Sequence, residues 1–161
     1  MEKKLSVVVS VYNEEQALPM FYETTKLILE ILPWDYELLF VNDGSRDDSL
    51  SILREYAARD EKVKFVSFSR NFGHEAAMIA GIDYADGDGI VCMDADLQHP
   101  PEKLAEMYRL WQQGYQVVEG VKVSRGKENP LHTLAAKTFY AAISGATGID
   151  MSRASDFKLL A

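Results

Sequence analysis

The chain has 161 residues, 47% of them hydrophobic, which is enough for one sizeable core, so we expect a single domain over 1–161. Its formal net charge of −8 argues against a general nucleic-acid binder, because such proteins present clustered Lys and Arg to phosphates. No apolar run approaches the roughly 20 residues of a membrane span, so we expect a soluble, cytoplasmic chain. The single cysteine, Cys92, excludes an internal disulfide, and we expect it to be a core residue.

The first 85 residues alternate between apolar runs and amphipathic patterns. The apolar runs predict strands over 5–11, 36–42 and 63–69. The patterns between them predict three helices, over 15–32, up to Arg59 and up to about Ala85. After the second strand, we expect Gly44 to permit a tight turn and the polar side chains of Asp43 and Ser45 to cap the following helix.

The second half of the chain continues the alternation. It predicts strands over 90–93 and 115–120, helices over 101–114 and about 130–144, a polar loop over 122–129, and a tail that contains 156–160. Strands that alternate with helices imply right-handed crossovers. The predicted fold class is therefore α/β, a doubly wound and mostly parallel Rossmann-like sheet with helices on both faces.

The sequence lacks the glycine motifs that usually hold phosphates in such sheets. No G-x-G-x-x-G follows a strand, and no G-x-x-x-x-G-K-[ST] is present. The first strand instead continues into Tyr12, Asn13 and Glu14. We therefore expect any bound phosphates to be held by a cation.

Two carboxylates one residue apart follow the apolar strand 90–93. Asp94 and Asp96, with the Gln98 amide oxygen, are hard oxygen ligands suited to Mg²⁺ or Mn²⁺, and a diphosphate would complete the shell. Strand ends of open α/β sheets are where ligands bind. The alternative is that the two aspartates only end a strand and cap the helix that Pro100 and Pro101 begin.

Basic residues are concentrated near the end of the chain. After Gly120 there are six Lys and Arg against three Asp and Glu, although the whole chain is acidic. This imbalance suggests an anionic substrate or membrane surface near the C-terminal part. A solvated charged face is the simpler alternative.

Five stretches resemble one enzyme family. They are 9–14 (VSVYNE), 40–45 (FVNDGS), 70–77 (RNFGHEAA), 93–102 (MDADLQHPPE) and 156–160 (DFKLL). In this order they resemble the inverting nucleotide-sugar glycosyltransferases of the GT-A fold, of the polyprenyl-phosphate type that includes dolichol-phosphate mannosyltransferase and bactoprenol-phosphate glucosyltransferases. Because relatives continue beyond the last stretch, we expect 1–161 to be a single GT-A catalytic domain truncated at its C-terminal end.

The resemblance implies roles for individual residues. It places the nucleotide against Tyr12, Asn13, Glu14, Val41 and Asp43, and the diphosphate beside Asp94, Ala95, Asp96 and Lys122. It assigns the metal to Asp94, Asp96 and Gln98, with Arg70 and Asn71 steadying the site. For Asn13 and Asp43, helix capping is the alternative. Arg70 could equally form a surface ion pair of small value.

Three positions depart from the family pattern. Lys122 stands where the family has arginine, so it can neutralise phosphate without arginine's planar fork. Ser10 replaces proline, and Ser155 replaces the glycine before Asp156. By resemblance Arg125 lies in a loop that closes over donor and acceptor phosphate, and a solvated loop is the alternative.

The implied reaction moves a hexose from a UDP- or GDP-sugar to a polyprenyl phosphate with inversion, aided by Mg²⁺ or Mn²⁺ on Asp94 and Asp96 and by Lys122 and Arg125. A phosphate acceptor is already anionic, whereas a sugar hydroxyl needs a base, for which Asp156 is the candidate. A transferase to a sugar hydroxyl and a non-catalytic nucleotide-binding module are the alternatives.

The expected location of the full-length protein is the inner face of the cytoplasmic membrane. The sequence leaves the donor base, the sugar and the oligomeric state open.

Overall fold

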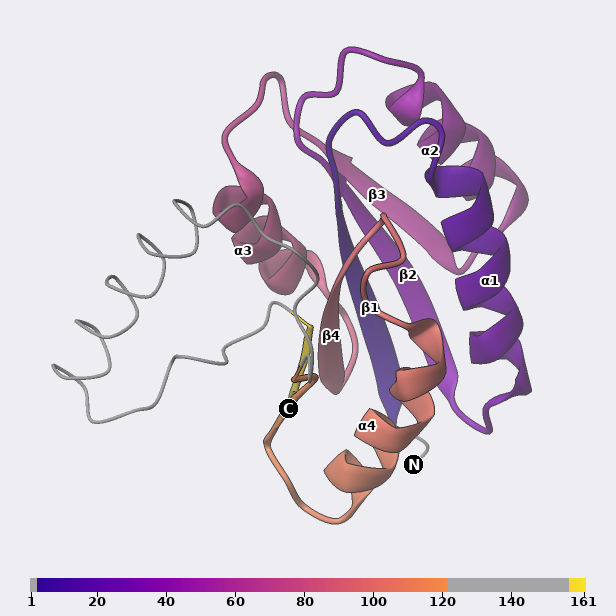
Figure 1. Cartoon of the computed structure of the whole chain (residues 1–161), viewed down its shortest axis with the longest axis vertical. Coiled ribbons are helices and arrows are strands. Elements are labelled where there is room, and N and C mark those ends of the chain that lie inside the picture. The colour runs from indigo at the N-terminus through magenta and orange to yellow at the C-terminus, as the bar shows by residue number, and fades with distance from the viewer. Residues whose placement is uncertain (1–2, 122–156) are drawn as a thin grey trace, which may run out of the picture.

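The computed structural model describes residues 3–121 and 157–161, which form a sheet with helices on both sides (Figure 1). The elements in chain order are β1 (Lys4–Val11), α1 (Leu18–Ile31), β2 (Asp35–Asn42), α2 (Ser49–Arg59), β3 (Val63–Ser67), α3 (His74–Tyr84), β4 (Gly89–Asp94), the 3₁₀ turn η1 (Pro101–Lys103), α4 (Leu104–Gln112), β5 (Val117–Glu119) and β6 (Lys158–Leu160). No helix in these ranges combines the length and apolar character needed to cross a bilayer.

The predicted elements before residue 121 are present, with shifted ends. α1 begins at Leu18 instead of Glu15, because residues 15–17 form a turn and Pro19 occupies the first helical turn, where its missing N–H costs nothing. The predicted 101–114 helix starts as η1 and ends before Gly114, whose φ of 99° suits glycine. The helix predicted over about 130–144 and the loop over 122–129 lie outside the described residues.

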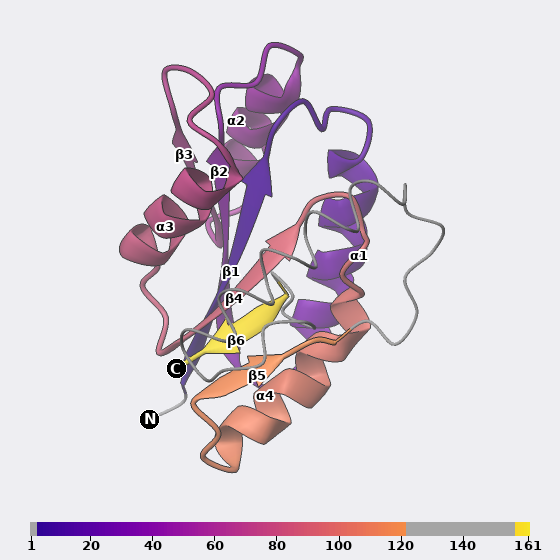
Figure 2. The ribbon, with the colours of Figure 1, turned by 60° about the vertical axis from the view of Figure 1, so that its left-hand side comes forward.

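The sheet has the strand order β3-β2-β1-β4-β6-β5. β1 pairs in parallel with β2 and with β4, and β2 pairs in parallel with β3. β6 lies antiparallel between β4 and β5, as Figure 2 shows for the three neighbouring strands. The mostly parallel sheet is therefore confirmed. β6 is an addition, because no strand was predicted in the tail.

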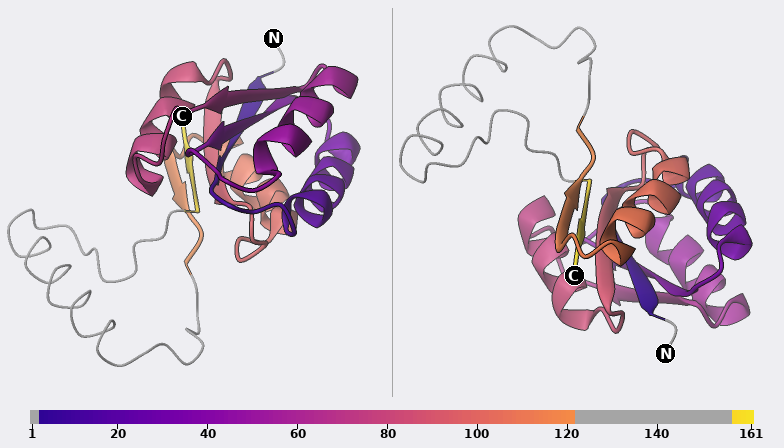
Figure 3. Two further views of the ribbon diagram at one scale, coloured as in Figure 1. Left: turned by 90° about the horizontal axis from the view of Figure 1, so that it is seen from above. Right: turned by 90° about the horizontal axis from the view of Figure 1, so that it is seen from below.

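Alternate residues of β1 pack into two different cores. Val7 and Val9 belong to the larger core, under α1, α2 and α4, whereas Val8 belongs to the smaller core, under α3. The two end-on views in Figure 3 show helices on both sides of the sheet. A central strand buried on both faces explains the nearly continuous apolar sequence of β1.

The α3 side of the sheet depends on small residues. Gly81 of α3 lies so close to β1 that a Cβ there would overlap the Val8 side chain. Close packing of α3 on the sheet therefore requires glycine at position 81. Cys92 of β4 is buried in the same core, as expected.

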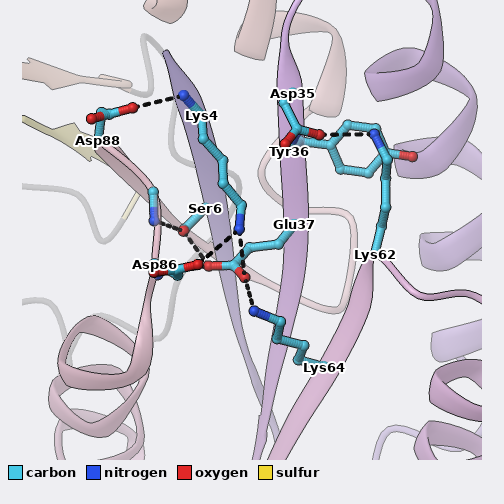
Figure 4. Close-up of polar contacts among 10 residues, drawn as sticks. Lys4, Ser6, Asp35, Tyr36, Glu37, Lys62, Lys64, Asp86 and Asp88 are labelled. Atoms are coloured by element: carbon cyan, nitrogen blue, oxygen red, sulfur yellow. Dashed lines mark hydrogen bonds and ion pairs between the residues drawn. The ribbon is translucent and has the colours of Figure 1, made fainter. Parts of the chain in front are cut away.

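A buried carboxylate links three strands near the amino end of β1 (Figure 4). Glu37 of β2 is 1% exposed and pairs with Lys64 of β3 at 2.7 Å and Lys4 of β1 at 3.4 Å, while Ser6 Oγ and the Asp86 N–H donate to it. Burial alone would raise the pKa of Glu37, but these donors outweigh it and lower the pKa to about 2. The cluster lies at the opposite end of the strands from the acids that follow β4.

Candidate active site at the carboxyl ends of the strands

The carboxyl ends of three parallel strands carry the predicted site residues. In the sheet register, Val11 of β1 lies beside Asn42 of β2, and Ser10 lies beside Asp94 of β4. The segments that follow these strands therefore leave the sheet at one edge, which is where open α/β sheets bind ligands. The structure thus brings 12–14, Asp43 and 94–98 to the same end of the sheet.

The segments after β1 and β2 are joined by hydrogen bonds. Asn13, at a left-handed φ of 52°, accepts a bond from the Arg46 N–H at 2.8 Å, and its own N–H donates to Ser45 Oγ at 3.0 Å. The Glu14 N–H donates to Ser49 Oγ at 2.9 Å. Asn tolerates the left-handed region better than most residues, which gives Asn13 a backbone reason to be there.

The capping roles considered for these loops are wrong. α1 has Ala17 at its N-cap and no side-chain cap, so Asn13 does not cap it. Asp43 and Ser45 do not cap α2, because both side chains bond to other loops. Asp47, which the sequence analysis missed, accepts from the N–H groups of Ser49 and Glu15 instead.

Asp43 is buried and fully engaged with the segment before α3. It is 3% exposed, and its two oxygens accept bonds from the Phe72 N–H at 2.7 Å, the Gly73 N–H at 3.1 Å and Asn71 Nδ2 at 3.1 Å. A carboxylate holding three donors fixes the loop that precedes α3. Its predicted contact with ribose or base stays a prediction, as does that of Val41, whose side chain is fully buried in the α3-side core.

Three carboxylates approach one another at the ends of β1 and β4. Burial raises the pKa of Glu14, and the nearby charges of Asp96 and Asp94 raise it further, with a contribution from Asp47. Like charges gathered in this way repel one another unless a cation lies among them. This electrostatic arrangement fits a divalent cation.

Asp94 and Asp96 do not act as helix caps. The N-caps of η1 and α4 are Pro100 and Lys103, and neither helix has a side-chain cap. Asp96 is exposed and accepts a bond from the Gln98 N–H at 3.0 Å, while the Asp94 side chain is 32% exposed. Both carboxylates can therefore be reached from solvent. Ala95 between them is buried.

The oxygen atoms of Asp94 and Asp96 suit a metal ion whose remaining coordination positions are filled by a bound ligand. Among residues 3–121 and 157–161, no three His, Cys, Asp or Glu side chains are arranged to hold a metal by themselves. Two aspartates leave most positions of a six-coordinate Mg²⁺ or Mn²⁺ to other oxygens, such as those of phosphates or water. The residues present therefore suit a metal bound together with a diphosphate.

Two histidines for which no role was predicted lie near Asp94. His74 Nε2 lies 3.9 Å from Asp94 Oδ1, and His99 Nε2 lies 3.9 Å from Asp94 Oδ2. His74 Nδ1 is 2.9 Å from Ser10 Oγ, so the serine that replaces the family's proline supplies a partner for this ring. Both histidines lie inside stretches that carry the resemblance, which was the available signal.

A cavity of about 320 Å³ opens between α4, the segment of Gln98 and His99, and the end of β5. Its walls combine apolar and polar side chains, including Gln98, His99, Met107, Val118 and Phe157. Tyr12, on the segment after β1, is 44% exposed. The predicted residues Lys122, Arg125 and Asp156 lie outside the described residues, so their roles stay predictions.

Comparisons with known proteins agree with this geometry. The family model "Glycosyl transferase family 2" matches residues 6–154. The chain is 47% identical over 156 residues to an uncharacterized glycosyltransferase, YkcC, of Bacillus subtilis, covering 96% of this chain and 48% of that protein. It is 41% identical over 137 residues to the bactoprenol glucosyl transferase of Shigella phage SfV, covering 85% and 45%. The chain thus spans about half the length of these curated relatives.

Solved structures share the fold. Glucosyl-3-phosphoglycerate synthase from Mycobacterium tuberculosis, crystallised with UDP, has a TM-score of 0.70 at 22% identity, covering 99% of this chain and 57% of that one. A mannosyltransferase from Pyrobaculum calidifontis, in complex with GDP-Man and Mn²⁺, has a TM-score of 0.59 at 23% identity, covering 76% and 36%. At these identities the likeness concerns the fold alone.

Proposed function

The chain belongs to glycosyl transferase family 2 and has the GT-A fold, and from that premise we propose that it is the catalytic part of a metal-dependent, inverting hexosyltransferase. The proposed donor is a nucleoside diphosphate sugar, with UDP or GDP as the leaving group. The proposed acceptor is a polyprenyl phosphate, reached at the inner face of the cytoplasmic membrane by the full-length protein.

One observation supports the donor and the metal: Glu14 leaves β1 beside the acids of β4, near enough that the charges of Asp96 and Asp94 add to the effect of burial in raising its pKa. A site that gathers negative charge is unsuited to binding a diphosphate directly. When bound there, Mg²⁺ or Mn²⁺ would act as a Lewis acid for the charge that grows on the departing diphosphate.

The chain's own residues would position the donor. Asn13 and Glu14 leave β1 beside the acids of β4, on a loop fixed to the segment after β2. Side-chain oxygens at this edge can accept hydrogen bonds from ribose hydroxyls or from the base. Lys122 is proposed to bind the diphosphate. It is the residue that follows the described segment ending at 121.

The acceptor is proposed from two independent indications. Relatives at 41% identity are named bactoprenol glucosyl transferases, and bactoprenol is a lipid carrier. The surplus of basic residues after Gly120 suits an anionic acceptor. Because a phosphate with a second pKa near about 6 is largely ionised at neutral pH, its attack needs no strong general base.

Calorimetry tests donor binding. Titration with UDP and with GDP, each with and without Mn²⁺, is expected to give metal-dependent binding of one of them. Absent binding of both, or binding that does not depend on the metal, would refute the metal-assisted donor site.

A donor screen tests the reaction. The full-length protein is incubated with UDP- and GDP-hexoses and undecaprenyl phosphate, and product mass is read. A lipid-linked hexose is expected. Transfer without lipid phosphate would favour a hydroxyl acceptor, and donor binding with neither transfer nor hydrolysis would favour a non-catalytic module.

A further inference from the structure

His99, which follows the Asp94–Asp96 pair, bonds to the Asp94 backbone and lies near the Asp94 carboxylate. Its Nδ1 accepts a hydrogen bond from the Asp94 backbone N–H at 3.1 Å. An accepting Nδ1 carries no proton, so the ring proton of the neutral imidazole is on Nε2. Nε2 lies 3.9 Å from Asp94 Oδ2, whereas His74 Nε2 lies 3.9 Å from the other carboxylate oxygen, Oδ1.

The His99 ring is held in this orientation from its other side. It is 5% exposed and stacks on Phe157, with ring centroids 5.1 Å apart and planes 7° from parallel. Phe157, at the start of the β6 segment, is 3% exposed, and its carbonyl accepts a bond from the Gly120 N–H at 2.8 Å. A Cβ at Gly120 would lie 2.5 Å from Phe157 Cδ1, so the ring rests directly on the backbone after β5.

We propose that His99 is a positioning residue that fixes the Asp94 carboxylate for the metal-bound diphosphate, and that Phe157 fixes His99. This rests on the proposed function, since it takes Asp94 as a cation ligand. Groups that orient a metal ligand through its hydrogen bonds commonly change affinity by about 10–100-fold when removed. The 3.9 Å separation is too long for a direct hydrogen bond in the ligand-free site. Hydrogen bonds at such sites commonly shorten only in the ligand complex.

The test separates the two nitrogens. His99→Phe keeps a stacking ring and removes both polar contacts. In His99→Asn the amide oxygen replaces Nδ1 as the acceptor for the Asp94 N–H. His99→Gln instead places an N–H donor near the Nε2 position. Glu102→Gln, at an exposed position three residues away, is the matched control.

Calorimetry measures the affinity for UDP or GDP, whichever the wild type binds. Each titration is done with Mn²⁺ and again without metal. Mn²⁺ electron paramagnetic resonance gives an independent reading of metal binding. We expect His99→Phe to lose about 10–100-fold in metal-dependent affinity. Metal-free nucleotide affinity and the unfolding transition should stay near wild type, and His99→Asn, His99→Gln or both should regain most of the loss.

The outcomes are distinct. Unchanged metal-dependent affinity in His99→Phe overturns the proposal, and so does an equal loss of metal-free binding, which indicates a purely structural role. Failure of both conservative variants to regain affinity while folding normally also overturns it. If the wild type binds neither nucleotide with Mn²⁺, the proposed function fails first and this inference fails with it. If His99→Phe does not fold, Phe157→Leu provides the test. We expect this variant to lose several-fold in metal-dependent nucleotide affinity, and an unchanged affinity would contradict the proposal.

Discussion

The Asp43 carboxylate accepts a 2.7 Å hydrogen bond from the Phe72 backbone N–H, which joins the end of β2 to the loop before α3. Two further donors, Asn71 Nδ2 and the Gly73 N–H, bind the same carboxylate. The loop leads directly into His74, which faces Asp94. A buried acid therefore determines the position of one wall of the candidate site.

Asp43→Asn should destabilise the protein by about 1–3 kcal/mol, because an amide has one acceptor oxygen for three donors and its NH₂ group opposes them. Urea unfolding measures the loss. Asp48→Asn, at an exposed position in the same region, should change stability by less than about 0.5 kcal/mol. Equal stabilities of the two variants would contradict this role of Asp43.

Asp94→Asn and Asp96→Asn should each weaken Mn²⁺-dependent nucleotide binding by roughly 100-fold or more, beyond the effect of groups that only orient a ligand. Metal-free nucleotide binding should not weaken, because each substitution removes a negative charge that repels phosphate. Calorimetry with and without Mn²⁺ measures both. Asp83→Asn, at an exposed position of α3, is the control. Wild-type affinity in both site variants would remove the case for a metal on these residues.

Glu14→Gln should stabilise the metal-free protein at pH 7 and weaken Mn²⁺-dependent nucleotide binding. Burial, Asp96 and Asp94 raise the folded pKa of Glu14. When folding raises the pKa of a carboxyl group, the protein is most stable at a pH below the group's pKa in the unfolded chain. Its stability falls as the pH rises through the pKa in the folded protein. The gain in melting temperature over wild type should therefore be seen at pH 7 and vanish near pH 4. Glu23→Gln, exposed on α1, should show no such pH dependence.

Glu37→Gln should cost about 3 kcal/mol at pH 7, because the donors around the buried carboxylate outweigh its burial and lower its pKa from the ordinary 4.5 to about 2. When folding lowers the pKa of a carboxyl group, its contribution to stability is present at a pH above its pKa in the unfolded chain. That contribution is lost as the pH falls through the pKa in the folded protein. The difference from wild type should thus shrink between pH 4.5 and pH 2. Glu55→Gln, which removes an exposed pair with Arg59, should cost less than about 1 kcal/mol.

Gly81→Ala should destabilise the protein by about 1–3 kcal/mol, because the added methyl group overlaps Val8 and forces α3 away from β1. Val8→Ala makes room for it. In the double variant, the glycine substitution should become neutral or favourable, since Ala exceeds Gly in helix propensity by about 1 kcal/mol. Denaturant unfolding of the four proteins gives the coupling, and strict additivity would contradict a direct contact.

The sequence predicted the α/β class and the order of strands and helices, because apolar periodicity is a local property that burial imposes on each segment. The stretch 93–102 likewise pointed to the acids after β4. What proved wrong was the helix capping considered for Asn13, Asp43 and Ser45. Their side chains suit helix caps when considered locally, whereas the structure gives them partners on other loops.

The sequence by itself determined that Asp94 and Asp96 follow a buried strand, and that this edge of the sheet carries acids where glycine loops are often found. Only the tertiary structure decided that Glu14 lies near both aspartates and that His99 sits between Asp94 and Phe157. Glu14 and the two aspartates are 80 and 82 positions apart, and His99 and Phe157 are 58 apart. These arrangements depend on the pairing of β4 with β1 and β6, and no local pattern specifies which strands become neighbours.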